Sequence, residues 1–509
     1  MVRKERKDMK RSKFSLSHYK LLSCSMGELV PIGLVEVLPG DTVQHATQML
    51  LRVLPLQAPV MHPVHVRVHH WFVPHRLVWE EWEDFITGGP DGMDDSSFPI
   101  INTPASTGFA VGSLADYLGV PPSVASRPVS ALPFRAYAKI FNEWYRDQDL
   151  QTPLVISEAS GTDTTTSTAL VNVAWEKDYF TTARPWEQKG PQVSIPLTGD
   201  APIVPSGPGA AINLKPQGTQ PADSFMGWKT AVGLDFKNAA GATNDSYVGL
   251  GTPSGMKADL SAVTSASIND LRLAMALQRY EEARARYGSR YVEYLRYLGV
   301  RSSDARLQRP EYLGGGKQTI QFSEVLQTTP TTDGDDTVGV GNLKGHGIAA
   351  MRSNRYRRFF EEHGYVISLL SVRPRTMYVD GLARTWNRRT KEDFWQKELQ
   401  HIGQQEVLNK EVYFPGGSPD GVFGYQDRYD EYRRMESGVA GEFRTTLDYW
   451  HMAREFSSAP ALNASFVSSN PTNRVYSVTD PDVDKLWIMA NHSIQARRMV
   501  ARTGTSFGL

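Results

Sequence analysis

The side chains best suited to chemistry lie together in one stretch, residues 60–89. Imidazole is the commonest metal ligand, and paired carboxylates can hydrolyse glycosidic bonds. The stretch therefore raises two hypotheses, a transition-metal site and a carbohydrate site. Its histidines and carboxylates are His62, His65, His69, His70, His75, Glu80, Glu81, Glu83 and Asp84.

The histidines belong mainly to a predicted strand, residues 64–73, because apolar and polar residues alternate there as in a half-buried sheet. A strand advances about 3.3 Å per residue, so His65 and His69 lie roughly 13 Å apart on one face. His70 points to the opposite face. A zinc site needs about 2.0–2.1 Å to each nitrogen. We therefore expect structural histidines and no metal ligands.

The carboxylates belong to a predicted short helix, residues 79–86. Helical spacing places Trp79, Trp82, Phe85 and Ile86 on an inward face and the carboxylates in water. Two carboxylates beside tryptophans would also suit a sugar site. We favour the packed helix, and a carbohydrate-binding or glycan-cleaving β-sandwich protein is the alternative function.

The composition is that of a globular protein. Of 509 residues 40% are apolar and 22% charged, and 55 Lys plus Arg balance 55 Asp plus Glu, so no whole-chain field favours nucleic acid or membrane. Cys24 is the single cysteine, which excludes an intramolecular disulfide and is compatible with assembly in a reducing cytoplasm. Because we find no secretory signal and no run of 18 apolar residues, we expect neither classical export nor membrane insertion.

Short strands dominate the chain, and long polar stretches interrupt them. The early strands should pair antiparallel because no helix separates them. Residues 151–265 are interpreted as a long elaborated loop and residues 301–360 as a loop-rich section. Strands are expected at residues 29–38, 42–56, 365–373 (buried on both faces) and 486–497, and helices at residues 133–149, from 267, at 290–298 and at 390–403.

Several motifs fail on their spacing. Residues 314–319, GGGKQT, resemble a phosphate loop, but Glu311 occupies the first glycine position and Gln318 replaces Ser or Thr. A calcium loop starting at Asp480 fails because Lys485 stands where glycine is required. Nothing near the lone cysteine activates it, and no hydrolase motif occurs. We expect no catalytic residue, no metal and no cofactor, and hence a protein that is not an enzyme.

The first 13 residues form a basic arm without apolar periodicity. Two hypotheses stay open for it, a phosphate-binding tail and a solubilising end. The cations that would face DNA under the first hypothesis are Arg3, Lys4, Arg6, Lys7, Lys10, Arg11 and Lys13.

Longer blocks of the sequence resemble those of one family, the major capsid proteins of microviruses, and most closely its gokushovirus-like group. The blocks occur in the family's order and cover most of the chain outside residues 200–265. The charged start before Met9 and the tail SIQARRMVARTGTSFGL depart from the family pattern. The blocks include PHRLVWEEWEDFITGG (74–89), KDYFTTARPWEQKGP (177–191), RYVEYLRYLGVRSSDARLQRPEYLGGG (290–316), EHGYVISLLSVRPR (362–375) and LDYWHMAREFSSAPALNASFV (447–467).

The resemblance implies a mainly β fold, an eight-stranded antiparallel viral jelly roll with long loop and helical insertions. From the charge of the start of the chain we expect a basic N-terminal arm at residues 1–20, and the resemblance implies a single jelly-roll capsid domain at 21–509. Within that domain it implies a surface insertion at about 150–265, with 197–262 as a candidate threefold protrusion, and helices and long loops at 266–360.

The implied function is that of a structural major capsid protein, which forms pentamers and then the smallest icosahedral (T=1) shell around a circular single-stranded DNA genome. The implied partners are a small basic DNA-binding protein, an internal scaffolding protein and a pilot protein of the same virus, and a host-cell surface receptor. The protein would reside in the virion after assembly in the host bacterial cytoplasm. Candidate subunit-interface residues, of the types that interface cores favour, are Tyr425, Arg428, Tyr429, Tyr432, Arg433 and Trp450.

Overall fold

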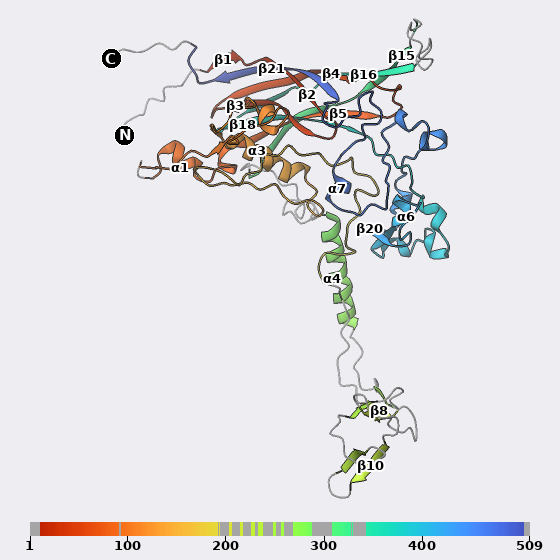
Figure 1. Ribbon diagram of the computed structural model, residues 1–509. Coiled ribbons are helices and arrows are strands. Elements are labelled where there is room, and N and C mark those ends of the chain that lie inside the picture. The colour runs from red at the N-terminus through yellow and green to blue at the C-terminus, as the bar shows by residue number, and fades with distance from the viewer. Residues whose placement is uncertain are drawn as a thin grey trace. The chain divides into compact units, whose positions relative to one another are not determined.

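The computed structural model divides the chain into two compact units, and Figure 1 shows their helices and strands. One unit is residues 1–187 with 284–509, and the other is residues 188–283. The helix predicted at 290–298 lies outside the described residues. The described segments are residues 11–90, 93–191, 193, 203–205, 214–216, 225–229, 233–237, 248–250, 256–258, 268–287, 308–326, 328 and 343–502.

The larger unit is built on two antiparallel sheets. The first has seven strands in the order β1 (Ser12–Ser15), β21 (Leu486–Arg498), β4 (Thr42–Val53), β16 (Leu343–Arg352) and β15 (Gln321–Leu326), with β2 (His18–Cys24) also paired to β21 and β17 (Tyr356–Phe359) to β4. The second has four strands in the order β14 (Glu311–Thr319), β5 (Val64–Pro74), β18 (Gly364–Pro374) and β3 (Leu29–Val37).

The predicted strands are confirmed where the hydrophobic pattern was strongest. β3, β5, β18 and β21 match the expected ranges within one or two residues, whereas β4 ends at Val53 and not at residue 56. β18 is buried along almost its whole length, as its continuous apolar run predicted. The antiparallel pairing and the mainly β class are confirmed as well.

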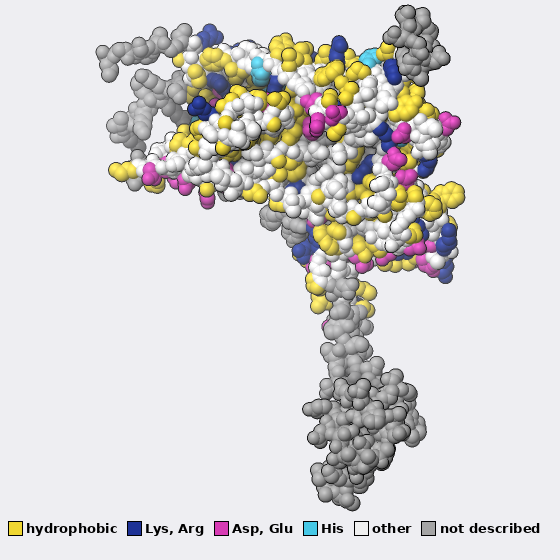
Figure 2. Space-filling view, viewed as in Figure 1, with side chains coloured by type: hydrophobic (Ala, Val, Ile, Leu, Met, Phe, Trp, Pro, Cys, Tyr) yellow, Lys and Arg dark blue, Asp and Glu magenta, His cyan; other side chains and the backbone are white. Residues whose placement is uncertain are grey.

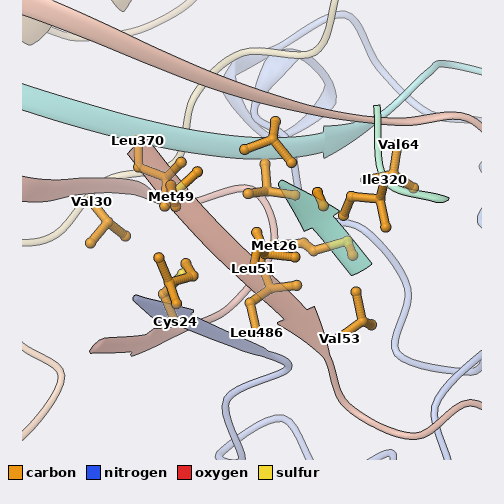
Figure 3. Close-up of a cluster of buried hydrophobic side chains, with 14 of the residues drawn as sticks. Cys24, Met26, Val30, Met49, Leu51, Val53, Val64, Ile320, Leu370 and Leu486 are labelled. Atoms are coloured by element: carbon orange, nitrogen blue, oxygen red, sulfur yellow. The ribbon is translucent and has the colours of Figure 1, made fainter. Parts of the chain in front are cut away.

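The main hydrophobic core lies between the two sheets (Figure 3). Leu51 of β4 and Leu486 of β21 belong to the seven-stranded sheet, and Val64 of β5 and Leu370 of β18 belong to the four-stranded sheet; all four join one buried cluster. Each fully buried aliphatic side chain contributes about 1.5–3 kcal/mol relative to exposure. Because alternation supplies such a side chain at every second strand position, this core holds the sheets together.

A helical layer packs against the other face of the four-stranded sheet. α3 (Leu132–Ile140) continues directly into a π-helical turn, η2 (Phe141–Tyr145). Trp71 of β5 and Leu369 of β18 share a second buried cluster with side chains of α3. The helix predicted at 133–149 is therefore confirmed over most of its length, and its aromatic stripe packs in the core.

Residues 301–360, expected to be loop-rich, contain the strands β14 to β17. β14 includes the GGGKQT motif and pairs with β5. A Cβ on Gly315 would lie 2.2 Å from the Val68 carbonyl oxygen, so glycine is required where β14 approaches β5. A cluster of glycines suggests a loop by composition, and composition alone does not reveal this close approach.

The helix predicted at 390–403 is wrong. Thr390 and Asp393 form a capping box, but only two 3-10 turns follow, η5 (Lys391–Asp393) and η6 (Leu399–His401). The hydroxyl of Tyr429 donates to the Phe394 carbonyl at 2.9 Å, so a side chain satisfies a backbone group that a helix would have paired internally.

Short elements complete the larger unit, and in the described part of the chain no helix is both long and apolar enough to cross a membrane. β6 pairs with β7, and β19 pairs with β20. The elements are η1 (His75–Leu77), α1 (Trp82–Thr87), β6 (Ile100–Asn102), α2 (Leu114–Leu118), β7 (Pro128–Ser130), η4 (Arg384–Asn387), β19 (Gln404–Leu408), α6 (Asn409–Val412), β20 (Val422–Asp427), η7 (Asp430–Tyr432), η8 (Gly441–Arg444), η9 (Asp448–Trp450) and α7 (Ala464–Val467).

In the predicted insertion, short antiparallel pairs replace part of the expected loop. The candidate protrusion at 197–262 is described only at these strands. The pairs are β8 (Ile203–Pro205) with β13 (Met256–Ala258), β9 (Leu214–Pro216) with β12 (Val248–Leu250), and β10 (Phe225–Lys229) with β11 (Gly233–Lys237). The helix predicted from residue 267 is confirmed as α4 (Ile268–Tyr287).

Candidate functional site

Three buried histidines meet between the two sheets. His45 of β4 and His492 of β21 come from the seven-stranded sheet, and His70 of β5 comes from the four-stranded sheet. His45 Nε2 lies 3.1 Å from His492 Nδ1, and the rings of His45 and His70 are 4.6 Å apart. His70 shares the inward face of β5 with Val66 and Val68, as the alternation predicted.

Neutral groups of the protein satisfy these three rings. Burial lowers the pKa of His45 to about 2, of His70 to about 3 and of His492 to about 4. No group of three metal-ligating side chains is placed to hold an ion in the part of the chain that the structure describes. The hydrogen bonds join His45 Nδ1 to Tyr356 Oη (3.1 Å), His70 Nδ1 to Ser368 Oγ (2.8 Å) and His492 Nε2 to the Ile32 carbonyl (2.9 Å).

His65 and His69 lie on the opposite face of β5, as predicted. His69 Nδ1 lies 2.7 Å from the Tyr145 hydroxyl, and burial lowers its pKa to about 4. His65 is partly exposed, and burial together with the nearby Lys317 ammonium lowers its pKa. Both imidazoles are therefore neutral near pH 7. Burial also lowers the pKa of His62 and His75 to about 4.

The acidic stretch after β5 forms a short helix beside a buried tryptophan. α1 begins at Trp82, later than predicted, and Trp79 before it is fully buried and donates Nε1–H to Ser160 Oγ at 2.7 Å. The carboxylates face water as expected. Phe85 and Ile86 are 38% and 48% exposed, which corrects the prediction that they pack inward. The Phe85 ring still packs on the Trp79 ring, with ring centroids 4.7 Å apart, so it is its other side that faces water.

The remaining sequence motifs also have structural explanations. Lys485 is buried, and its ammonium donates to the carbonyls of Asp480 and Val483, so a lysine fills the place a calcium ion would need. Residues 314–319 form part of a strand and no phosphate loop. Burial raises the pKa of the Cys24 thiol well above its usual range, which disfavours the nucleophilic thiolate.

A cavity of about 260 Å³, lined in part by residues of η4, α6 and η7, was not foreseen from the sequence. Tyr179, Tyr378, Arg384, Glu411 and Glu436 are among its lining residues. Arg384 Nη1 donates to Glu411 Oε1 at 2.9 Å, and burial raises the pKa of Glu436 to about 7. Because these groups come from segments far apart in the chain, no local motif could have identified them.

The candidate interface residues differ in how much surface they offer. Tyr429 is buried within the subunit, whereas Tyr432 and Arg433 are exposed. The Arg388 guanidinium stacks on the Tyr432 ring at 4.4 Å, and Arg433 Nη1 lies 3.4 Å from Asp430 Oδ1. Tyr425, Arg428 and Trp450 are partly buried.

Only the end of the basic arm falls in the described chain. Lys13 is exposed on β1, and the Arg11 guanidinium lies 5.0 Å from the centre of the Phe359 ring on β17. The other candidate cations lie outside the described residues: Arg3, Lys4, Arg6, Lys7 and Lys10.

These features define a class of protein. Two packed antiparallel sheets, with long insertions between the strands and tyrosine- and arginine-rich outer loops, match a viral coat β-sandwich. The comparison with protein families makes the assignment specific. The chain belongs to the capsid protein (F protein) family, whose model matches residues 4–506.

Three relatives are each described as capsid protein VP1. The protein of Bdellovibrio phage phiMH2K is 39% identical over 493 residues, which covers 94% of this chain and 91% of the relative. The protein of Chlamydia phage 1 is 35% identical, with 93% and 92% covered, and that of Spiroplasma virus 4 is 32% identical, with 91% and 88% covered. The resemblance to microvirus capsid proteins is confirmed, and the chain has the role of a structural major capsid protein.

Proposed function

We propose that this chain assembles, through pentamers, into a small icosahedral shell that encloses a circular single-stranded DNA genome. The observation that carries the proposal is the family match, which extends from residue 4 to residue 506 and therefore includes both sheets and the insertions. A pentamer needs a heterologous contact that closes a ring, so two different surfaces of each subunit must be complementary.

The strand order supports an eight-stranded jelly roll within the two sheets. In chain order the eight strands are β2, β3, β4, β5, β14, β16, β18 and β21. They separate into the neighbour orders β2-β21-β4-β16 and β3-β18-β5-β14, which is the pairing that two Greek keys produce. β1, β15 and β17 are then additions at the margins of one sheet.

Exposed aromatic and arginine side chains support subunit contacts near η7. Tyr432 is 49% exposed, and arginine stacked on an aromatic ring is typical of interface hot spots. We propose that Tyr432 and Arg433 belong to the contact between subunits. Tyr425, Arg428 and Trp450, which are partly buried, would border it.

Further partners follow from the shell. A neutral chain cannot by itself balance the charge of a packaged genome, so a small basic DNA-binding protein would do most of the condensation. An internal scaffolding protein, a pilot protein and a host-cell surface receptor complete the proposed set. The subunit would assemble in the host bacterial cytoplasm and remain in the virion, without catalytic activity.

The assembly proposal is tested with the full chain expressed with the other proteins of its virus. We expect uniform icosahedral particles in electron micrographs and a single fast-sedimenting species that contains DNA. Monomers alone, under conditions that give soluble protein, would contradict the proposal.

Two deletions test the insertion and the arm. Removal of residues 200–262 should leave shell formation intact and alter attachment to the host cell, since we propose that 197–262 forms a protrusion at the threefold axes. Removal of residues 1–13 should lower the DNA retained or change nothing, as the two hypotheses for the arm allow. Loss of all shells after either deletion would show that the segment is needed for assembly.

A further inference from the structure

We propose that the outward face of the seven-stranded sheet is a binding surface for the packaged single-stranded DNA. The inference rests on the proposed function, since it names the surface of the coat subunit that meets the genome. It starts from the strand register, which determines the side chains that share this face.

Every second residue of β21 turns away from the core. Trp487 and Met489 are exposed, while Ile488 between them is buried. β21 pairs with β4 without a register shift, so Arg52 stands beside Trp487 and Leu50 beside Met489. The outward face is therefore one continuous surface that spans both strands and continues onto their neighbours.

All charged side chains at the outward strand positions of this face are cationic. Among the described residues, none of these cations forms an ion pair with a carboxylate. Yet the whole chain carries equal numbers of acidic and basic residues, so the strand positions of this face concentrate one sign. The Asp484 carboxylate, to which Ser23 Oγ donates, belongs to the loop before β21. Uncompensated cations are expected where a polyanion binds, because its phosphates replace the missing counter-charges. The cations are Lys13, Arg52, Lys344, Arg352, Arg357 and Arg497.

Large apolar and aromatic side chains lie between the cations. Leu21 is 78% exposed, Tyr19 69%, Trp487 47% and Met489 41%, and the two strands that carry them, β2 and β21, are paired side by side. Leu21, Trp487 and Met489 line an open hollow together with Arg52. Figure 2 shows yellow and dark blue side chains side by side along the upper margin, where this sheet lies. Aromatic rings beside cations are the combination that binds single strands, because the bases are unpaired and free to stack.

The described end of the basic arm, Arg11 and Lys13, lies on the same face. Lys13 of β1 pairs in register with Arg497 of β21, and the neighbouring position across β4 and β17 is Phe359. The Arg11 guanidinium lies 5.0 Å from the Phe359 ring centre, so the chain just before β1 already lies against this surface. The described end of the arm, Arg11 and Lys13, thus lies at the edge of the proposed DNA surface.

The charge of the face selects among possible occupants. A small basic protein would be repelled by six unpaired cations, and a packed segment of this chain would leave those cations buried and uncompensated. A membrane with anionic lipids has the right sign but offers no bases to stack on the aromatic rings. Single-stranded DNA satisfies both the cations and the rings.

The location of the DNA is tested first in intact, DNA-filled particles. Ultraviolet cross-linking followed by peptide mass spectrometry should join nucleotides to peptides that contain Trp487 and Tyr19. Cross-links confined to other peptides would overturn the inference while leaving the shell proposal standing. Failure of the wild-type chain to form shells would instead contradict the shell proposal.

The energetic contribution is tested by the anisotropy of a labelled thymidine oligonucleotide with the purified full chain across a salt series. Arg52→Gln combined with Arg352→Gln should reduce the slope of log affinity against log salt by about 1.4, since each phosphate contact on a single strand contributes about 0.7. Lys391→Gln with Lys397→Gln, exposed cations outside the sheet, is the matched control and should leave the slope unchanged.

The aromatic contribution has its own matched pair. Trp487→Leu should weaken binding at least about five-fold at constant salt slope, since stacking of one base is worth that much or more. Trp386→Leu removes a tryptophan that is 69% exposed in η4 and should have no effect. Equal losses in both variants would contradict a specific platform. If Trp487→Leu left DNA binding unchanged but abolished binding to anionic vesicles, the face would be assigned to a membrane instead.

Discussion

The two sheets of the larger unit share one core, but their second faces differ. On the four-stranded sheet Trp71 and Leu369 are covered by α3 and the turn that follows it. On the seven-stranded sheet the corresponding side chains Trp487 and Met489 remain exposed, with Arg52 beside Trp487. The two sheets are built from similar strands, but one is covered by a helix and the other is not. Their roles therefore differ.

This difference has an energetic meaning. Burial of a large apolar side chain stabilises the fold by about 1.5–3 kcal/mol. The second face of the four-stranded sheet gains this stabilisation, whereas the second face of the seven-stranded sheet does not. Contiguous exposed apolar residues on a folded surface mark an interaction site. We infer that the four-stranded sheet serves mainly stability within the subunit, and that the seven-stranded sheet serves a partner.

The largest expected effect concerns the histidines that join the two sheets. In the unfolded chain an imidazole takes up a proton near pH 6.5, whereas His492 in the fold stays neutral down to about pH 4 and His70 and His45 to lower values. Between these limits the unfolded state binds more protons, so the free energy of unfolding falls as the pH falls below about 6.5. Each histidine contributes about 1.4 kcal/mol per pH unit in this window.

Urea unfolding of the full chain at pH 7 and pH 5 measures this effect. His70→Gln should weaken the pH dependence of the free energy of unfolding by the contribution of one histidine. The reason is that a glutamine amide can accept the hydrogen bond from Ser368 but takes up no proton. His346→Gln, an exposed position on β16, is the control. The same pH dependence in wild type and His70→Gln would show that the cluster does not couple acid to stability.

A smaller but still large effect is expected in the helical layer over the four-stranded sheet. The side chains of Arg135 in α3 and Asp163 are both completely buried, and Arg135 Nε donates to Asp163 Oδ2 at 2.8 Å. Arg135→Met leaves a buried carboxylate without its cation, which costs about 3–5 kcal/mol. Thermal unfolding of the full chain measures this loss, with exposed Arg389→Met as the control. Equal melting temperatures for Arg135→Met and the control would mean that the helical layer is not essential to the fold.

The comparison of the sheets is tested most directly by one substitution on each. Leu369→Ala opens a cavity under α3 and should lower the free energy of unfolding by about 2–5 kcal/mol. Met489→Ala, on the uncovered face of the other sheet, should change it by no more than about 0.5 kcal/mol. Similar losses for the two variants would show that the seven-stranded sheet is covered within the subunit after all.

The sequence allowed the central strands to be predicted because alternation and apolar runs are local. β5, β18 and β21 follow from their own residues, and the parity of β5 correctly separated His70 from His65 and His69. Strand β14 was not predictable in this way, because the need for Gly315 arises from Val68, nearly 250 positions away. The tyrosine that replaces helical hydrogen bonds near residue 394 is distant as well.

The candidate sites also differ in whether the local sequence reveals them. The histidines and carboxylates of residues 60–89 were visible in the sequence, and spacing alone argued against a metal site. The cationic face was not visible, because Lys13, Arg52, Lys344 and Arg497 come from four strands spread over the whole chain. Only the register of the folded sheet brings them to one side.

The smallest expected effect concerns α1, whose carboxylates prompted the carbohydrate hypothesis. Trp79 belongs to the buried cluster between the four-stranded sheet and α3, while the side chains of Glu81 and Glu83 are exposed. Glu81→Gln and Glu83→Gln should therefore each change the free energy of unfolding by no more than about 0.5 kcal/mol, because neither removes packing. Wild-type protein should show neither glycan binding on an array nor sugar release. Glycan binding or cleavage that disappears in both variants would show that the four-stranded sheet also supports a carbohydrate site. The inference that this sheet serves mainly stability would then be wrong.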